Sequence, residues 1–406
     1  MQLWEPGTQF WRSVRDLPRA ITPSSASAGL VAALLGVTGP TLLVYQAAVN
    51  SGFSNQEIAS WFFAIFGVSG VFSIWLAMAY RQPICGAYSI AGAALLLQAL
   101  PHFTLSQAVG AYVLQGVLIT ALALTGWFER LMRLIPAPII MGMLAGILLR
   151  FAVGIFTDLV SDPILVGLTL VAYVVAQRRA QLFPPVTVAL VVGVVLALWL
   201  HPLPSAPIPL TITLPSFFAP VFTLKAFLTL TLPLVLLTLS SQNATGIGVL
   251  WALGYRAPIH AITLATGLFS LITAPMAGHG VNLATPMTAI CGDAGAHRDP
   301  DLRWGASVVN GVLFSTFGVL GLTLLALIRV LPLGLIRTVA GLALLPVILQ
   351  SLERSFGTGK HRFGCLFALV IAASGVQFFG IGAAFWSLLG AMAISLVADR
   401  DWGRAA

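Results

Sequence analysis

The sequence predicts an all-α membrane protein of about 14 transmembrane segments, built as two inverted repeats of seven. Its 406 residues are 58% hydrophobic and only 8% charged, with a mean hydropathy of +0.98. Soluble domains carry about 25% charged residues, so this chain could not cover itself with polar groups in water. Apolar runs long enough for a membrane helix recur along the chain, and one nonapeptide has a counterpart in the second half.

Each predicted span is an apolar run bounded by charged residues or by Pro and Gly, and a full membrane helix needs about 20 such residues. The first repeat, 26–200, follows an N-terminal segment, 1–25, whose charged residues precede any long apolar run. Its seven spans are predicted near residues 26–49, 57–79, 84–100, 104–126, 136–156, 163–177 and 184–200. A proline-studded linker, 201–225, separates them from the second repeat, 226–398. The seven spans of that repeat are predicted near residues 226–251, 258–278, 280–292, 304–328, 333–351, 363–380 and 383–398.

Basic residues predict the topology, because cytoplasmic loops of membrane proteins carry an excess of Lys and Arg. With the N-terminus in the cytoplasm, sixteen of the 20 basic residues fall on the cytoplasmic side. The other four are Arg150, Lys225, Arg329 and Arg337. We therefore expect a multi-pass protein of the cell inner membrane, with both termini and segment 1–25 cytoplasmic and the linker extracytoplasmic.

An internal repeat supports the division into two halves. Residues 110–118, GAYVLQGVL, resemble residues 305–313, GASVVNGVL, at an offset of 195 (305 − 110). Chance similarity between Gly/Ala-rich helices is the alternative explanation. A repeat of seven spans is odd, so the halves must insert in opposite orientations, which is an architecture typical of secondary transporters.

Spans three and ten are the most interrupted, and they occupy corresponding places in the two halves. The interrupting residues are Pro83, Gly86, Gly92, Gly278, Gly280 and Pro286. We expect each span to be an extended stretch followed by a half-helix, with Ser89 matching Ala284 at the same offset (284 − 89 = 195). Two half-helix N-termini facing one cavity would attract an anion, since each carries about half a positive charge. The alternative is a pair of kinked packing helices.

Polar residues in the spans near these breaks form the predicted substrate site, because polar groups at membrane depth usually face a cavity or a partner helix. The residues expected to bind substrate are Tyr45, Gln46, Tyr88, Ser89, Gln242, Asn243, Asn282, Leu283, Ala284 and Thr285. His279 is the candidate for proton coupling, with a structural role as the alternative. Hydrogen bonding between helices is the alternative role of the amides. No acidic residue lies in the middle of a span, which suits an anionic substrate.

Other classes of function find little support. Cys85, Cys291 and Cys365 have no spacing suited to a metal, so no metal or other cofactor is expected. The basic residues are scattered, without the clusters that bind nucleic acid. No HExxH, GxSxG or P-loop motif is present, so the sequence does not predict an enzyme.

Three stretches resemble the BenE-type benzoate:proton symporter family. They are GHGVNLATPMTAICGDAGAHRDP in span ten, RQPICGAYSIAGAALL in span three and SSQNATGIGVL in span eight, and the similarity covers about residues 22–398. The resemblance implies uptake of an aromatic carboxylate with protons. It also implies the seven-plus-seven fold shared with uracil/xanthine permeases and sulphate-type anion transporters, in which a core domain moves against a gate domain, often within a homodimer.

On this resemblance the core domain is formed by 26–126 and 226–328, and the gate domain by 136–200 and 333–398. The expected function is import of benzoate or a related aromatic carboxylate by alternating, elevator-like access. The carboxylate would lie between the two half-helix N-termini, and Tyr45, Tyr88 or Ile84 would hold the ring. Three alternatives stay open at this stage: an exchanger of inorganic or dicarboxylate anions with the same fold, a passive channel and an intramembrane enzyme.

Overall fold

The structure, a computed structural model, describes residues 7–126, 136–178, 185–200, 210–379 and 381–399. The first repeat contains the α-helices α2 Pro23–Val37, α3 Gly39–Asn50, α4 Asn55–Phe62, α5 Ser69–Tyr80, α6 Ile90–Ala99, α7 Leu105–Thr125, α9 Ala137–Ser161, α10 Pro163–Gln177 and α11 Pro185–Leu200. The π-helical turn η1, Phe63–Val68, joins α4 to α5, and the short strand β1, Gly86–Ala87, precedes α6.

The second repeat begins with one long span that alternates between α-helical and π-helical turns. It runs through α12 Leu224–Ala226, η3 Phe227–Thr231, α13 Leu232–Leu236, η4 Leu237–Asn243 and α14 Ala244–Ala252. The later elements are α15 Ile259–Thr273, the strand β2 Asn282–Leu283, α16 Thr285–Gly292, α17 Trp304–Val319, α18 Gly321–Arg329, α19 Leu333–Phe356, α20 Arg362–Ser374 and α21 Ala383–Ala398.

All 14 predicted spans coincide with these elements, which confirms the predicted all-α membrane fold. In the described part of the chain, seven helices are long and apolar enough to cross a bilayer, and the bent pair α17–α18 makes an eighth. Five shorter apolar helices and the eight-residue α16 account for the remaining spans. Predicted span 363–380 is shorter than expected, because α20 ends at Ser374 and Gly375 follows in the left-handed conformation.

Several spans are broken where the sequence reading treated them as continuous. Span one divides at Thr38, because Pro40 follows in the first turn of α3 and cannot continue the hydrogen bonds of α2. Span eleven bends by 73° between α17 and α18. Each break turns the second part of the span, so residues before and after it face different neighbours.

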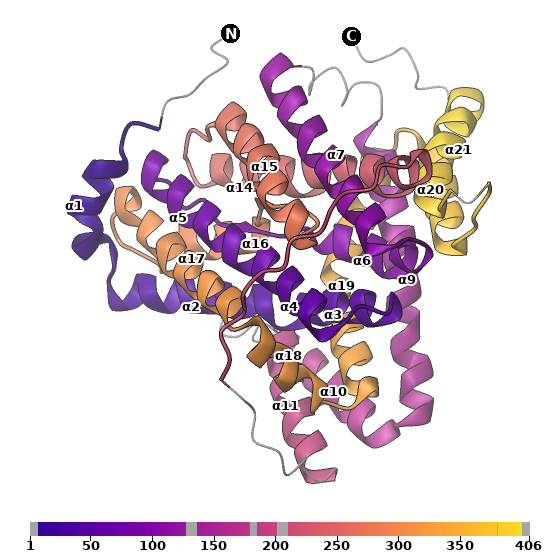
Figure 1. Cartoon of the computed structure of the whole chain (residues 1–406), viewed down its shortest axis with the longest axis horizontal. Coiled ribbons are helices and arrows are strands. Elements are labelled where there is room, and N and C mark those ends of the chain that lie inside the picture. The colour runs from indigo at the N-terminus through magenta and orange to yellow at the C-terminus, as the bar shows by residue number, and fades with distance from the viewer. Residues whose placement is uncertain (1–6, 127–135, 179–184, 201–209, 380, 400–406) are drawn as a thin grey trace.

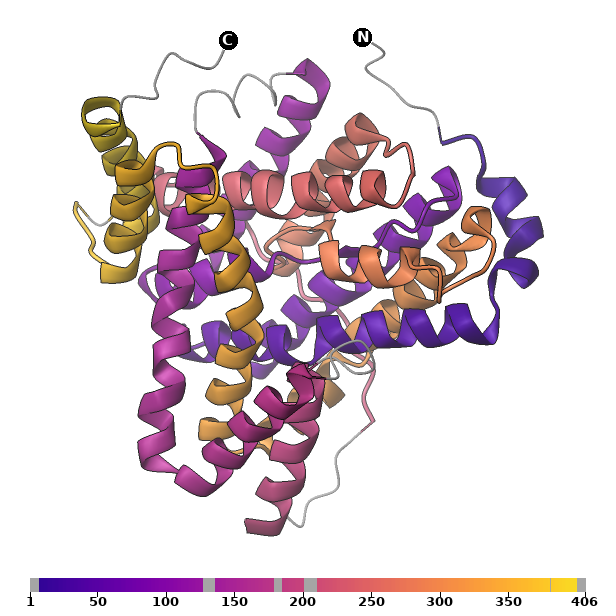
Figure 2. The same cartoon turned by 180° about the vertical axis from the view of Figure 1, so that it is seen from behind.

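The helices pack as two sets, each containing elements of both repeats. In one set α17 packs on α2 and α5, α15 on α7, α3 on α6, and α16 on α2 and α14. In the other, α9 packs on α19 and α20, α20 on α21, and α10 on α11 and α19. Figures 1 and 2 show α9 and α19 side by side, with α20 and α21 at the edge of the molecule. The sets meet mainly where α3 crosses α19 and α6 crosses α9.

The N-terminal segment forms an amphipathic helix, α1 Phe10–Ala20, docked on α5 and α17 (Figure 1). The Ser13 hydroxyl donates to the Met78 carbonyl over 2.7 Å, and the Arg81 guanidinium lies 2.8 Å from the Asp16 carboxylate. Trp11 on the opposite face is exposed. A basic helix with an exposed tryptophan is typical of the membrane interface.

The N-terminus of α20 is stabilised from the far end of α21. The Asp399 carboxylate accepts the backbone N–H groups of Phe363 and Gly364, at 3.0 and 2.9 Å. Partial burial raises the pKa of Asp399, but these two hydrogen bonds outweigh it and hold the pKa below its usual value. The charged form of Asp399 therefore fastens α21 to α20.

Candidate anion-binding site between two half-helices

The two repeats meet at a short antiparallel pairing of β1 and β2. Gly86 lies opposite Leu283 and Ala87 opposite Asn282, and all four residues are buried. The Ala284 N–H also donates to the Cys85 carbonyl over 2.7 Å. Because extended backbone in a membrane must find partners inside the protein, each interrupted span satisfies its strand with the strand of the other.

A half-helix begins directly after each strand, as the sequence predicts. Ser89 is the N-cap of α6 and Ala284 is the N-cap of α16. These are the two residues that the offset of 195 brings into register, so the repeat extends to single positions at the helix ends. Both N-termini therefore start at the β1–β2 pairing.

The two helix ends differ in how their N–H groups are satisfied. The Ser89 hydroxyl accepts the Gly92 N–H over 2.9 Å, which caps α6. Ala284 has no side-chain oxygen, and the N–H groups of Thr285 and Met287 have no acceptor in the part of the chain that the structure describes. The end of α16 therefore retains N–H groups that an anion could occupy.

Two neighbouring amides on η4 have different environments. The Asn243 oxygen accepts the Leu283 N–H at 2.9 Å, and its nitrogen donates to the Thr266 hydroxyl at 3.0 Å, so this amide braces β2. Gln242 lines a small cavity beside Ala284. Consecutive side chains point in different directions in any helix, and both amides lie in the π-helical turn η4, a feature frequent at functional sites.

His279 is completely buried and links two elements of the first repeat. Its Nδ1 accepts the Trp61 indole N–H at 3.0 Å, and its Nε2 lies 3.1 Å from the Ser89 carbonyl. Indole nitrogen only donates and carbonyl oxygen only accepts, so the neutral tautomer with hydrogen on Nε2 satisfies both contacts. Tyr88 and Tyr112 pack their rings at the edges of the imidazole.

The central cavity at the helix ends has a volume of about 30 Å³. Its lining comes from α2, span three, η4 and α16, and comprises Leu35, Gly36, Ala87, Tyr88, Ile90, Gln242, Ala284, Pro286 and Met287. None of these described lining residues is acidic or basic. A space of this size holds a water molecule or two, so an aromatic acid would need the surrounding helices to separate.

The predicted substrate residues occupy three kinds of position. Tyr88, Gln242 and Ala284 line the central cavity, and Thr285 lies at its edge, where its hydroxyl contacts the Thr245 hydroxyl. A second group is buried behind the lining and holds the two strands. Its members are Ser89, Asn243, Asn282 and Leu283. With the Asn282 amide oriented to satisfy both of its ends, its oxygen accepts the Ser89 N–H at 2.9 Å.

The third group comprises Tyr45 and Gln46, which lie outside the central cavity. Tyr45 packs against the main hydrophobic core, and Gln46 lines a second cavity between α3, α6, α9 and α19. Conversely, sequence reasoning missed Gly36 and Met287 in the central lining and Trp61 beside His279. A Cβ at position 36 would collide with Met287 and Phe314, so this glycine lets α2 approach α16. The only sequence signal near it is the Thr38–Pro40 break.

Comparison with known proteins agrees with the fold and identifies the family. Residues 19–397 match the family model described as benzoate membrane transport protein. The chain is 34% identical over 386 residues to the inner membrane protein YdcO of Escherichia coli, covering 94% of this chain and 98% of that one. It is 32% identical over 365 residues to the benzoate membrane transport protein of Acinetobacter baylyi, covering 90% and 92%.

Solved structures show the same seven-plus-seven inverted-repeat fold. The transmembrane domain of the cyanobacterial bicarbonate transporter BicA aligns with a TM-score of 0.57 and 16% identity, covering 93% of this chain and 96% of that chain. SLC26A9 aligns with a TM-score of 0.62 and 12% identity, covering 95% and 67%. The family match and the relative from Acinetobacter baylyi show that this chain is a membrane transporter, and that it belongs to the benzoate membrane transport protein family.

Proposed function

We propose that this protein is a secondary active transporter that imports benzoate or a related aromatic carboxylate together with protons. The observation that carries the proposal is the uncapped end of α16, which faces a cavity without acidic side chains. Membership of the benzoate membrane transport protein family supports the choice of substrate, as does the relative from Acinetobacter baylyi with that name.

In this proposal the carboxylate accepts the free N–H groups of Thr285 and Met287. The helix end contributes roughly 1 kcal/mol, or about 2 kcal/mol when partly buried, and the N-terminus of α6 adds a second, weaker contribution. The Gln242 amide can donate a further hydrogen bond from η4. The ring would pack against the apolar lining formed by Leu35 and Ile90, which favours an aromatic acid over an inorganic anion of the same charge.

Transport requires the central cavity to widen and to open on alternate sides. We assign 26–126 and 226–328 to a moving core, and 136–200 and 333–398 to a gate. The half-helices and their strands then move together, because the β1–β2 pairing joins them. Contacts of α3 with α19 and of α6 with α9 form the sliding surface.

Proton coupling is assigned to His279, whose ring contacts the Ser89 carbonyl at the N-terminus of half-helix α6. A second proton would bind Nδ1, the atom that accepts the Trp61 N–H. Two donors would then face each other, so protonation would separate the ring from Trp61 on α4. The proposed coupling is therefore a change in the packing of α4 against the half-helices.

In the proposed topology the protein lies in the cell inner membrane with both termini in the cytoplasm. This topology is supported by the positive-inside rule, because it puts sixteen of the 20 basic residues on the cytoplasmic side. The printed name of the Escherichia coli relative, an inner membrane protein, is consistent with this location. A homodimer is proposed as the assembly, with the gate as the part that stays fixed in the membrane.

Uptake of labelled benzoate into proteoliposomes tests the proposal. An inside-alkaline pH gradient should drive accumulation above equilibrium, and a protonophore should abolish it. Absence of uptake with any aromatic acid would refute the assigned substrate. Uptake of sulphate or a dicarboxylate that needs an internal anion, ignores the pH gradient and is not inhibited by benzoate would identify an exchanger, whereas single-channel currents would identify a channel.

A further inference from the structure

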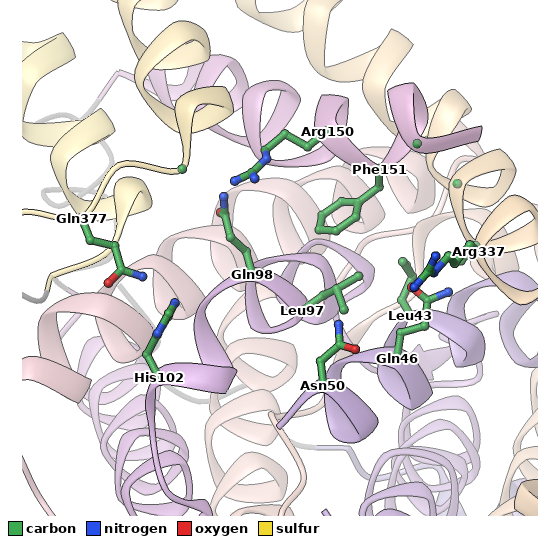
Figure 3. A pocket seen from close by; sticks show the side chains of 14 residues that line it. Leu43, Gln46, Asn50, Leu97, Gln98, His102, Arg150, Phe151, Arg337 and Gln377 are labelled. Carbon is green, nitrogen blue, oxygen red and sulfur yellow. The ribbon is translucent and has the colours of Figure 1, made fainter. Parts of the chain in front are cut away.

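A second cavity, of about 530 Å³, lies between the two sets of helices (Figure 3). Its walls come from the C-terminal ends of α3 and α6, from α9 and α19, and from the segment between α20 and α21. The volume falls in the range of small-molecule pockets. The central cavity, at about 30 Å³, is a separate space.

The side chains of this cavity offer an excess of positive charge and of hydrogen-bond donors. Among the residues that the structure describes, Arg150 and Arg337 line it, and no carboxylate does. Among the described residues Arg150 has no carboxylate within 4.0 Å, and Arg337 reaches Asp158 only at 3.8 Å. An arginine without an acidic partner, in a cavity that a small molecule can enter, is suited to bind a carboxylate.

Two glutamines add donors to this charge. The Nε2 groups of Gln46 and Gln98 are both buried and have no acceptor in the described structure. Figure 3 shows the Gln98 amide directed toward the Arg150 guanidinium, and Gln46 beside Arg337. A buried N–H donor without an acceptor costs free energy. An anion whose oxygens accept from Gln98 beside Arg150, or from Gln46 beside Arg337, would remove that cost.

The cavity also has an apolar side. Phe151 follows Arg150 on α9, and Figure 3 shows its ring between the guanidinium and Leu97 on α6. A guanidinium next to an aromatic ring and an aliphatic side chain matches an acid that carries a carboxylate on a hydrophobic ring. Inorganic anions would use only the polar half of this cavity.

The absence of a side chain at Gly375 leaves the space that the Arg150 guanidinium occupies. This glycine adopts a left-handed backbone conformation with φ +67°, and a Cβ there would collide with the Arg150 guanidinium. The same Cβ would lie 3.0 Å from the Gln98 amide nitrogen. The segment between α20 and α21 therefore packs its backbone directly against both donors.

We propose that this cavity is a second binding site for a monocarboxylate, centred on Arg150, where the anion is held before it reaches the half-helices. Gln98 lies eight residues after Ile90 on α6, or about 12 Å along the helix from the central cavity. In the proposed topology the cavity opens to the extracytoplasmic side. The identity of the acid as benzoate rests on the proposed function, whereas the binding of a carboxylate at Arg150 does not.

Arginine modification with phenylglyoxal, followed by peptide mass spectrometry, tests the site on the purified full-length protein. Benzoate should slow the modification of Arg150 at least tenfold and leave that of Arg329 unchanged, since Arg329 is exposed and lies outside the cavity. Acetate, which lacks the ring, should protect more weakly. Equal modification rates of Arg150 with and without carboxylate would overturn the proposal.

Kinetics of variants give a second readout. Arg150→Gln should raise the KM for benzoate uptake at least tenfold and change kcat less than twofold, because the substitution leaves the binding site at the half-helices unchanged. Gly375→Ala should act in the same direction, and the control Arg329→Gln should have no effect. Uptake with an unchanged KM in Arg150→Gln would refute the second site alone. Protection of Arg150 without any benzoate uptake would instead refute the proposed function and keep the site.

Discussion

Replacement of His279 by alanine should destabilise the protein strongly, because the ring joins α4 to the start of α6 through two buried hydrogen bonds. The substitution leaves the Trp61 N–H without an acceptor and the Ser89 carbonyl without this donor. It also empties a space enclosed by Trp61, Tyr88 and Tyr112.

The expected loss follows from these contacts. The Trp61 N–H that loses its acceptor costs about 1–3 kcal/mol, whereas the Ser89 carbonyl still accepts the Ala93 N–H at 2.8 Å. The lost packing of a buried ring adds to this, so His279→Ala should cost about 3–5 kcal/mol. For a chain of 406 residues, that corresponds to a melting temperature lower by about 3–6 °C. Asparagine can place its oxygen near Nδ1 and glutamine its nitrogen near Nε2, so each should lose only one hydrogen bond and cost less.

Thermal unfolding in detergent, followed by tryptophan fluorescence, measures these differences. In a Trp61→Phe background the His279→Ala substitution should cost about 1–3 kcal/mol less, because no indole N–H is then left unpaired. His102→Ala serves as the control, since His102 is exposed and should change stability by less than about 0.5 kcal/mol. A His279→Ala protein as stable as wild type, or an equal cost in both backgrounds, would refute the linking role.

Three further predictions concern other positions. Ala284→Ser should cap the Met287 N–H, raising stability without ligand by about 1 kcal/mol and raising the KM for benzoate; thermal unfolding and uptake kinetics measure the two effects. Gly246→Ala would place a Cβ 2.5 Å from Leu283, so it should cost about 1–3 kcal/mol and reduce uptake, whereas the nearby Gly248→Ala, with nothing within 4 Å, should do neither. The lowered pKa of Asp399 stabilises the fold above its unfolded pKa near 4, and this contribution is lost as pH falls through the folded pKa; Asp399→Asn should lower the melting temperature at neutral pH and flatten its decline in acid.

The positions of the spans could be predicted from sequence because the bilayer imposes a length on every apolar run. The half-helices were predictable for a related reason. Proline and glycine weaken a helix, and spans three and ten each contain several of them close together. A helix that stops at membrane depth needs a partner for its exposed backbone, which here is a strand of the other repeat. The match of Ser89 with Ala284 followed from the repeat, and the structure places both residues as N-caps.

The orientation of individual side chains was less predictable. Gln46 follows Tyr45 in sequence, but the break after Thr38 turns α3 so that Gln46 lines the cavity with Arg150. The π-helical turn η4 has no signature in hydrophobic periodicity, so the separate environments of Gln242 and Asn243 could not be read from their spacing. Hydrogen bonds such as that from Trp61 to His279 join residues 218 positions apart, and a single sequence does not record them.

The pairing of β1 with β2 also bears on how the chain assembles during synthesis. The first repeat leaves the ribosome with an unpaired strand inside the membrane, and its partner is almost two hundred residues away. Until that partner arrives, the nascent half exposes backbone donors and acceptors that lipid cannot satisfy. A gene divided between the repeats should therefore yield little stable protein from either fragment alone, while co-expressed fragments should rescue each other by complementation.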